Sequence, residues 1–281
     1  MKTILVRVLA ATLAILLTAC DDDEVISSSN IATNDIYATM ELHTDGSGRV
    51  FVGVQLTKDQ PPSDASSSDQ YIELRGSDEL WFTSGVNMRD LEIEGDLFDA
   101  LEGVARTQEL VEGTTRFRDE GWFWSHLFPI QTYYDGSLEV TEEGATYTVS
   151  LLREEAADAK SSTVTMPLPF DILAPRPGET YSRSGDPILI EWLPVGADVQ
   201  VELEATTSCT DGSFDSFSTT QAVDSGILLL NPGDLMSDNL SGTCSTQLTL
   251  AKSRLGQADP AFVGGYISAH QVRAVSVTTT D

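Results

Sequence analysis

The feature that most constrains this fold is a two-residue alternation that begins at Ile36. Apolar side chains occupy every second position from there to Leu42, and mainly polar side chains stand between them. After an Asp- and Gly-rich turn at 45–48, the same alternation runs from Val50 to Leu56. Successive side chains of a strand point to opposite faces, so the pattern predicts a β-hairpin with one buried and one solvent-facing side.

Shorter runs of the same kind predict a mainly all-β chain. Further strands are expected at 71–75, 80–83, 88–93, 122–134, 138–141, 146–152, 163–166, 172–174, 187–192, 199–204, 227–230, 246–250 and 266–278. One short helix is expected in the first domain, where Asp96 caps a turn in which Leu97, Leu101 and Val104 share a face. About seven short strands in the last third of the chain predict a β-sandwich.

Two domains are expected, with a boundary in a proline-rich linker at 167–178. Prolines at 167, 169, 175 and 177 predict a stiff, extended link that continues into the next domain. The N-terminal β-rich domain would span 35–166, and the C-terminal sandwich would span 172–281. Removal of 19 residues from the 281 leaves 262, which is enough for two modest domains.

The first 20 residues have the form of an export signal. Lys2 and Arg7 give a basic start, and the apolar run at 8–17 is too short to span a bilayer. The run ends in Leu17-Thr18-Ala19-Cys20, which resembles the lipobox of bacterial lipoproteins. The resemblance implies cleavage of a signal peptide at 1–19 and acylation of Cys20, for example with palmitate. The alternative is an ordinary secretory signal that ends in a cysteine.

Residues 20–34 predict a solvated tether behind this anchor, because four acidic residues at 21–24 are followed by serines at 27–29. The resemblance implies a lipid-anchored protein of the bacterial cell envelope that faces the periplasm or the cell surface, with the choice of membrane left open. The chain has 16 Lys+Arg against 44 Asp+Glu, a net charge of −28. Such a surface repels phosphate backbones, which argues against nucleic-acid partners.

Two cysteines remain once Cys20 is acylated. In an exported chain Cys209 and Cys244 are expected to form a disulfide. It would close a loop of about 36 residues, a contribution of roughly 4 kcal/mol in the chain-entropy model. The alternative, a two-thiolate metal site, lacks neighbouring histidines.

The start of the second domain has a recognisable pattern. Its residues are Ile172, Pro175, Pro177, Gly178, Asp186, Pro187, Ile188, Ile190 and Trp192. They resemble the opening of Ig-like or fibronectin-type modules in bacterial surface proteins, which implies that Trp192 is a core tryptophan. Since Cys209 follows this tryptophan, a bridge from a loop to a neighbouring strand is expected instead of an antibody-type bridge between sheets. No activity follows from such a fold.

Aromatic residues gather at 121–135, and four of them are candidates for binding: Trp122, Trp124, Tyr133 and Tyr134. Because both faces of this stretch are apolar, a core strand covered on both sides is favoured. The alternative is an exposed aromatic platform for sugar rings or for a partner protein.

No catalytic constellation emerges from the sequence. His43 is expected on the solvent side of its strand, and Ser268 and His270 share one side of the last strand without a nucleophile-elbow motif. No cofactor is expected. Structural calcium is an alternative, at Asp211, Ser213 and Asp215 or between the domains at Asp171, Glu179 and Asp186.

These observations favour a non-enzymatic interaction or structural module of the cell envelope that contacts an envelope protein. A lipoprotein that binds glycan or peptidoglycan through the aromatic platform is the first alternative, and an envelope hydrolase is the second.

Overall fold

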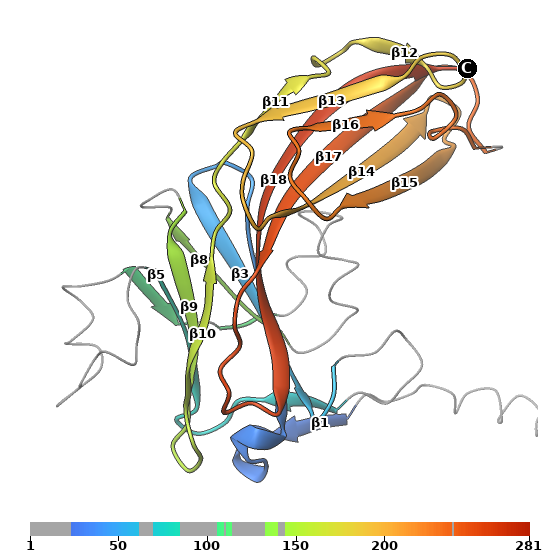
Figure 1. Ribbon diagram of the computed structural model, residues 1–281. Coiled ribbons are helices and arrows are strands. Elements are labelled where there is room, and N and C mark those ends of the chain that lie inside the picture. The colour runs from blue at the N-terminus through green and yellow to red at the C-terminus, as the bar shows by residue number, and fades with distance from the viewer. Residues whose placement is uncertain are drawn as a thin grey trace, which may run out of the picture.

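The structure is a computed structural model that describes residues 24–61, 70–84, 106–109, 111–113, 133–139, 144–237 and 239–281 (Figure 1). Of residues 106–109 and 111–113 and of Tyr133 it describes the backbone alone. Within this described part the chain is all-β, apart from two single turns of 3-10 helix, η1 (Ser28–Asn30) and η2 (Thr33–Asp35). The predicted fold class is therefore confirmed. The helix expected at 96–104 lies outside the described residues.

The strands of the N-terminal half are β1 (Glu24–Ser27), β2 (Ile36–Thr44), β3 (Arg49–Lys58), β4 (Gln70–Glu73), β5 (Glu79–Ser84), β6 (Arg106–Glu109), β7 (Val111–Gly113), β8 (Tyr133–Glu139), β9 (Thr146–Leu152) and β10 (Ala159–Thr165). Those of the C-terminal half are β11 (Asp171–Ala174), β12 (Thr180–Ser182), β13 (Ile188–Leu193), β14 (Gln200–Cys209), β15 (Phe214–Gln221), β16 (Ile227–Leu230), β17 (Cys244–Leu255) and β18 (Gly264–Thr280).

One large sheet runs through both halves in the order β1-β4-β3-β2-β18-β17-β14-β15. Two smaller sheets pack on it: β10-β9-β5-β6 in the N-terminal half and β11-β13-β16 in the C-terminal half. The first part of β18 pairs with β2 in parallel, and most of β18 pairs with β17 in antiparallel register. Figure 1 shows the long β17–β18 hairpin connecting the two halves.

The predicted β-hairpin forms one wall of the N-terminal core. Ile36 and Leu42 of β2 and Val50 and Leu56 of β3 are completely buried, as their alternation predicted. They belong to a cluster that includes Phe82, Tyr147 and Val149 of the four-stranded sheet.

The C-terminal sandwich has its own core, in which Trp192 is buried as expected. Val275 and Val277 of β18 pack there, whereas Ile267 and Ala269 of the same strand pack in the N-terminal core. The single strand β18 thus serves both cores, and the division of the chain into domains at 35–166 and 172–281 stays a prediction.

Residues 24–34, expected in the tether, are folded. β1 pairs in parallel with β4, and the buried guanidinium of Arg153 holds the next residues against the body. Arg153 donates to Asp78 Oδ2 at 2.7 Å, to the Ser28 carbonyl at 2.6 Å and to the Ile31 carbonyl at 3.0 Å. Ser28 is therefore buried and hydrogen-bonded, whereas Ser29 remains exposed as expected. The same segment lines a cleft of about 920 Å³, to which we assign no ligand.

Candidate functional site

The outer face of the three-stranded sheet β11-β13-β16 is mainly apolar and exposed. Ile188 and Ile190 of β13 point into the core, but the alternate residues Leu189 and Leu193 are 38% and 56% exposed. On the neighbouring strand β16, Ile227 and Leu229 are 46% and 51% exposed. We call these four exposed residues, Leu189, Leu193, Ile227 and Leu229, the leucine face.

The sheet register brings the members of the leucine face together. Leu189 lies directly opposite Leu229, and Ile227 lies opposite Glu191. Leu193 lies opposite Asp171 of β11. Cross-strand neighbours of this kind stand within side-chain contact distance, so Leu189, Leu229 and Ile227 form one apolar patch. Glu191 lies on the same face between Leu189 and Leu193, so the patch includes one partly buried carboxylate, and Asp171 stands beside Leu193.

The opposite outer face of the sandwich, on the large sheet, is polar. Glu202 and Ser208 of β14, Ser245 and Gln247 of β17, and Ser276 of β18 are all exposed. Here the strands follow the usual pattern of apolar residues inside and polar residues outside. The leucine face departs from it, because β16 is apolar on both sides and β13 is apolar on both sides except at Glu191.

A sheet that is apolar on both sides is normally covered on both sides. Covering the exposed half of one Leu or Ile side chain contributes about 1 kcal/mol, so the leucine face offers roughly 4 kcal/mol to a partner. Exposed clusters of this kind mark binding surfaces in soluble domains. Leu173 and Val195, both about half exposed, extend the apolar surface beyond the two strands.

A buried ion pair fastens the small sheet to the large one. Lys252 Nζ of β17 lies 2.7 Å from Asp224 Oδ2 and donates to the Pro194 carbonyl at 2.5 Å. Trp192 Nε1 donates to Asp224 Oδ1 at 2.6 Å, and Gly196 N donates to Oδ2 at 2.7 Å. Burial alone would raise the pKa of Asp224, but the hydrogen bonds from Lys252 and Trp192 prevail and hold it below the usual value. The leucine face is thus presented on a rigid support.

Of the predicted aromatic site, the structure describes one side chain. Tyr134 is 3% exposed, accepts a hydrogen bond from Leu74 N at 2.7 Å and donates to the Ile72 carbonyl at 3.3 Å. The platform hypothesis is therefore wrong at Tyr134, because this ring packs in the N-terminal core. Trp122, Trp124 and the side chain of Tyr133 lie outside the described part of the structure.

Ser268 and His270 do come together. Ser268 Oγ lies 2.9 Å from His270 Nε2, and burial lowers the pKa of His270 to about 4, so the ring is neutral at pH 7. Glu41, opposite Ser268 in the register, accepts a hydrogen bond from the Tyr266 hydroxyl at 2.8 Å. Ser268 is only 4% exposed and His270 is partly buried, so the pair lies in a largely buried polar layer, and we assign it no reaction.

His43 lies beside this layer and is partly buried, so it is less exposed than its expected position on the solvent side implied. Its ring stacks on Phe51 with 5.1 Å between centroids, and burial lowers its pKa to about 4.

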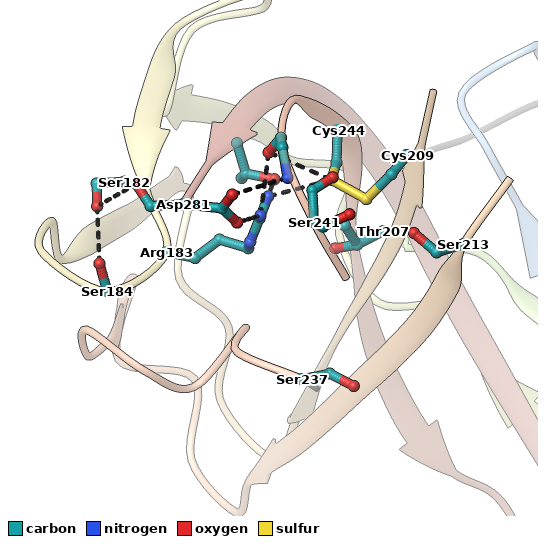
Figure 2. Close-up of polar contacts among 12 residues, drawn as sticks. Ser182, Arg183, Ser184, Thr207, Cys209, Ser213, Ser237, Ser241, Cys244 and Asp281 are labelled. Atoms are coloured by element: carbon teal, nitrogen blue, oxygen red, sulfur yellow. Dashed lines mark hydrogen bonds and ion pairs between the residues drawn. A yellow bond between two sulfur atoms is a disulfide. The ribbon is translucent and has the colours of Figure 1, made fainter. Parts of the chain in front are cut away.

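The disulfide between Cys209 and Cys244 is present, as predicted (Figure 2). It joins directly opposed residues of the neighbouring strands β14 and β17. The expectation that it would join a loop to a neighbouring strand is therefore wrong.

Three of the carboxylates considered for calcium are engaged with protein donors. Glu179 accepts from Tyr181, Asp186 accepts from Ser182 N, and Asp211 accepts from Ser213. Within the described ranges no three or more His, Cys, Asp or Glu side chains are grouped so as to hold a metal ion. Likewise, no helix in the described part is long and apolar enough to cross a membrane.

The sequence analysis missed the leucine face, although the signal was present. The run at 227–230 is apolar at every position and the run at 188–193 at every position but Glu191, unlike the strands at 200–209 and 244–255 that accompany them in the sandwich. Arg183, a buried cation beside the disulfide, was also not predicted. No local sequence pattern indicates that this arginine is buried.

Comparison with known proteins yields distant structural neighbours. No protein-family model and no curated protein matches the sequence. A structure of Dpr11 IG1 bound to DIP-gamma IG+IG2 is 8% identical, covers 88% of this chain and 98% of its own, and has a TM-score of 0.22. A DUF4785 family protein of Legionella pneumophila is 10% identical with a TM-score of 0.24; the match covers 77% of this chain but about half, 52%, of that one. The calcium binding domain CBD12 of CALX1.1 is 12% identical, with 79% and 81% covered and a TM-score of 0.19. TM-scores this low carry no argument about function.

Proposed function

We propose that this protein is a lipid-anchored, non-enzymatic interaction module of the bacterial cell envelope that binds a partner protein through the leucine face. The observation that carries the proposal is the exposure of Leu189, Leu193, Ile227 and Leu229 on one rigid sheet. Four large aliphatic side chains in one patch are unfavourable in water unless a partner covers them.

The position of the leucine face supports this role. Cys20, the residue with the lipobox context, precedes the first residue of β1 by four positions. In Figure 1, β1 lies at one end of the molecule, and β11, β13 and β16 lie at the other. Acyl chains on Cys20 would therefore hold the leucine face away from the membrane, where an envelope protein has access to it.

The chemistry of the leucine face favours a protein over a glycan. Sugar rings are bound by aromatic stacking and by polar side chains, whereas the four residues are aliphatic. The carboxylate of Glu191 lies within the patch, that of Asp171 stands beside Leu193, and the whole chain carries a net charge of −28. A partner with an apolar centre and a basic rim would match this surface.

The anchor is tested by fractionation of the cells that produce the protein. Cys20→Ala is expected to remove acylation and to shift the protein out of the membrane fraction, and mass spectrometry of the N-terminal peptide reads the acyl chains directly. An unmodified Cys20, or an unprocessed signal at 1–19, would contradict the lipoprotein part of the proposal.

The leucine face is tested by affinity capture from envelope extracts with a double variant, Leu189→Asp/Leu229→Asp. Because the chain is already acidic, the matched control adds the same two charges to the polar face, as Ser245→Asp/Gln247→Asp. We expect the first variant to capture at least tenfold less of one discrete protein than the parent does. The control should capture as much of it as the parent. Equal capture by both variants would exclude the leucine face as the binding surface.

A further inference from the structure

Arg183 makes an unusual contact with the disulfide. It follows β12 and is 5% exposed, and its Nη1 donates to Cys244 Sγ at 3.1 Å and to Thr279 Oγ1 at 3.3 Å. Its Nη2 donates to the Gly242 carbonyl at 3.0 Å and pairs with the carboxylate of Asp281. Figure 2 shows the guanidinium lying against the Cys244 side of the sulfur–sulfur bond.

The two sulfur atoms therefore have different surroundings. Cys244 is 3% exposed and has the guanidinium against it, with the carbonyl oxygens of Ser241 and Gly242 farther away at 3.8 Å. Cys209 is 9% exposed and ends β14, where the exposed turn 210–212 begins. A hydrogen bond from a cation stabilises a thiolate, so the cleaved state favours negative charge on Cys244.

We propose that the Cys209–Cys244 disulfide is a thiol-exchange site whose co-reactant is a dithiol, with Cys209 as the attacked sulfur and Cys244 as the leaving group. A disulfide opens faster when its leaving thiolate is stabilised. Arg183 is the positioning residue that selects which sulfur leaves. This inference does not depend on the lipid anchor or on the leucine face.

The exchange balances in two steps. A thiolate of the dithiol forms a bond to Cys209 Sγ, the Cys209–Cys244 bond breaks, and its electron pair stays on Cys244 Sγ, which accepts the hydrogen bond from Arg183. The second thiol of the dithiol loses its proton to water and attacks its partner sulfur in the mixed disulfide, and Cys209 leaves as a thiolate that takes a proton from water. The dithiol is oxidised to a disulfide, and the protein pair is reduced by two electrons.

The charges around the site allow two variants with opposite effects. Asp281 neutralises part of the Arg183 charge. A second carboxylate, Asp211, lies near the site, where it accepts a hydrogen bond from Ser241 at 2.9 Å. Arg183→Gln removes the cation, so reduction should slow. Asp281→Asn removes the competing carboxylate, so reduction should quicken. If Arg183 only stabilised the local fold, loss of either Arg183 or Asp281 would destabilise the structure around the disulfide. Both variants would then be reduced faster.

The experiment measures the rate of reduction of the folded full chain by dithiothreitol, with alkylation and mass spectrometry as the readout. We expect Arg183→Gln to be reduced about tenfold more slowly than the parent and Asp281→Asn several-fold faster. The matched control is Arg254→Gln, which removes a guanidinium bound to the carbonyls of Ala197 and Asp198, and it should not change the rate. An Arg183→Gln rate equal to or above that of the parent would overturn the proposal.

A second measurement needs no variant. The folded parent is exposed to glutathione, a monothiol, and the mixed disulfide is trapped at acid pH and located by peptide mapping. Glutathione on Cys209 supports the assignment, whereas glutathione on Cys244 or an even distribution overturns it.

Discussion

The two sheets of the C-terminal sandwich differ in how they meet solvent. The large sheet continues through β17 and β18 into the N-terminal core, is cross-linked by Cys209–Cys244 and has a polar outer face. The three-stranded sheet rests on it through the core and the Asp224–Lys252 pair, and its outer face is mainly apolar. In the C-terminal half, the large sheet thus has the residue pattern of a sheet buried on one side. The small sheet has mainly the pattern of a sheet buried on both sides.

The large sheet also differs between its own halves. In the C-terminal half the polar residues alternate outward into water, as at Gln247. In the N-terminal half the corresponding polar face is buried: Thr39, Glu41, Gln55 and Ser268 are 1–4% exposed. Alternation therefore identifies the side that faces the apolar core, but it does not establish that the other side is solvated.

The largest effect is expected from the link between the two sheets. Asp224→Asn leaves the buried ammonium of Lys252 without its counter-charge, which should lower the free energy of unfolding by about 3–5 kcal/mol. Denaturant unfolding measures the loss, with the exposed Asp171→Asn as control, for which a change within about 0.5 kcal/mol is expected. A loss below 1 kcal/mol for Asp224→Asn would mean that packing alone joins the sheets.

Neighbouring residues of β13 test the two sides of the small sheet. Ile190 is 0% exposed and Leu189 is 38% exposed. Ile190→Ala should destabilise the fold by about 2–5 kcal/mol, because it leaves a cavity in the core. Leu189→Ala should change the unfolding free energy by only about 0.5 kcal/mol. Similar losses from both substitutions in thermal or denaturant unfolding would show that the leucine face is already covered within the chain.

The buried polar layer should make the free energy of unfolding depend on pH. Burial raises the pKa of Glu41 from 4.5 to about 7, against a smaller lowering by its hydrogen bond from Tyr266. Between pH 4.5 and 7 the folded state holds a proton that the unfolded state has released, so this residue adds stability as the pH falls through that window.

Glu41→Gln removes the cost of the buried charge and keeps an acceptor for Tyr266. At pH 8 it should raise the free energy of unfolding by on the order of 2 kcal/mol, and the gain should shrink towards pH 5. The difference between variant and parent cancels the opposite contribution of the buried histidines. The exposed Glu155→Gln serves as control, and a gain independent of pH would contradict the assignment.

Much of the fold was predictable from local patterns. The alternation at 36–56 placed β2 and β3, and the runs at 146–152 and 227–230 coincide with β9 and β16. β15 was missed because only Phe214 and Phe217 of its eight residues are large and apolar.

Other features depend on tertiary contacts that local patterns do not encode. The pattern of β18 is the same whichever core it faces, so its passage between the two cores was not visible in the sequence. The disulfide was predictable from compartment and cysteine number, but Arg183 reaches Cys244 from a position 61 residues away. The leucine face had a sequence signal in the apolar runs of β13 and β16. The signal could not be interpreted as an exposed surface without the structure, in which the sandwich leaves that side uncovered.

Site-specific photo-crosslinking in the producing cells tests the role of the leucine face most directly. A photoreactive residue is placed at Leu229 and, in a separate variant, at Gln247 on the polar face of the same sandwich. We expect a discrete protein adduct from position 229 and none from position 247, and an adduct of twice the chain mass would identify the partner as a second copy. No adduct at position 229, or the same adduct from both positions, would contradict the leucine face as the binding surface.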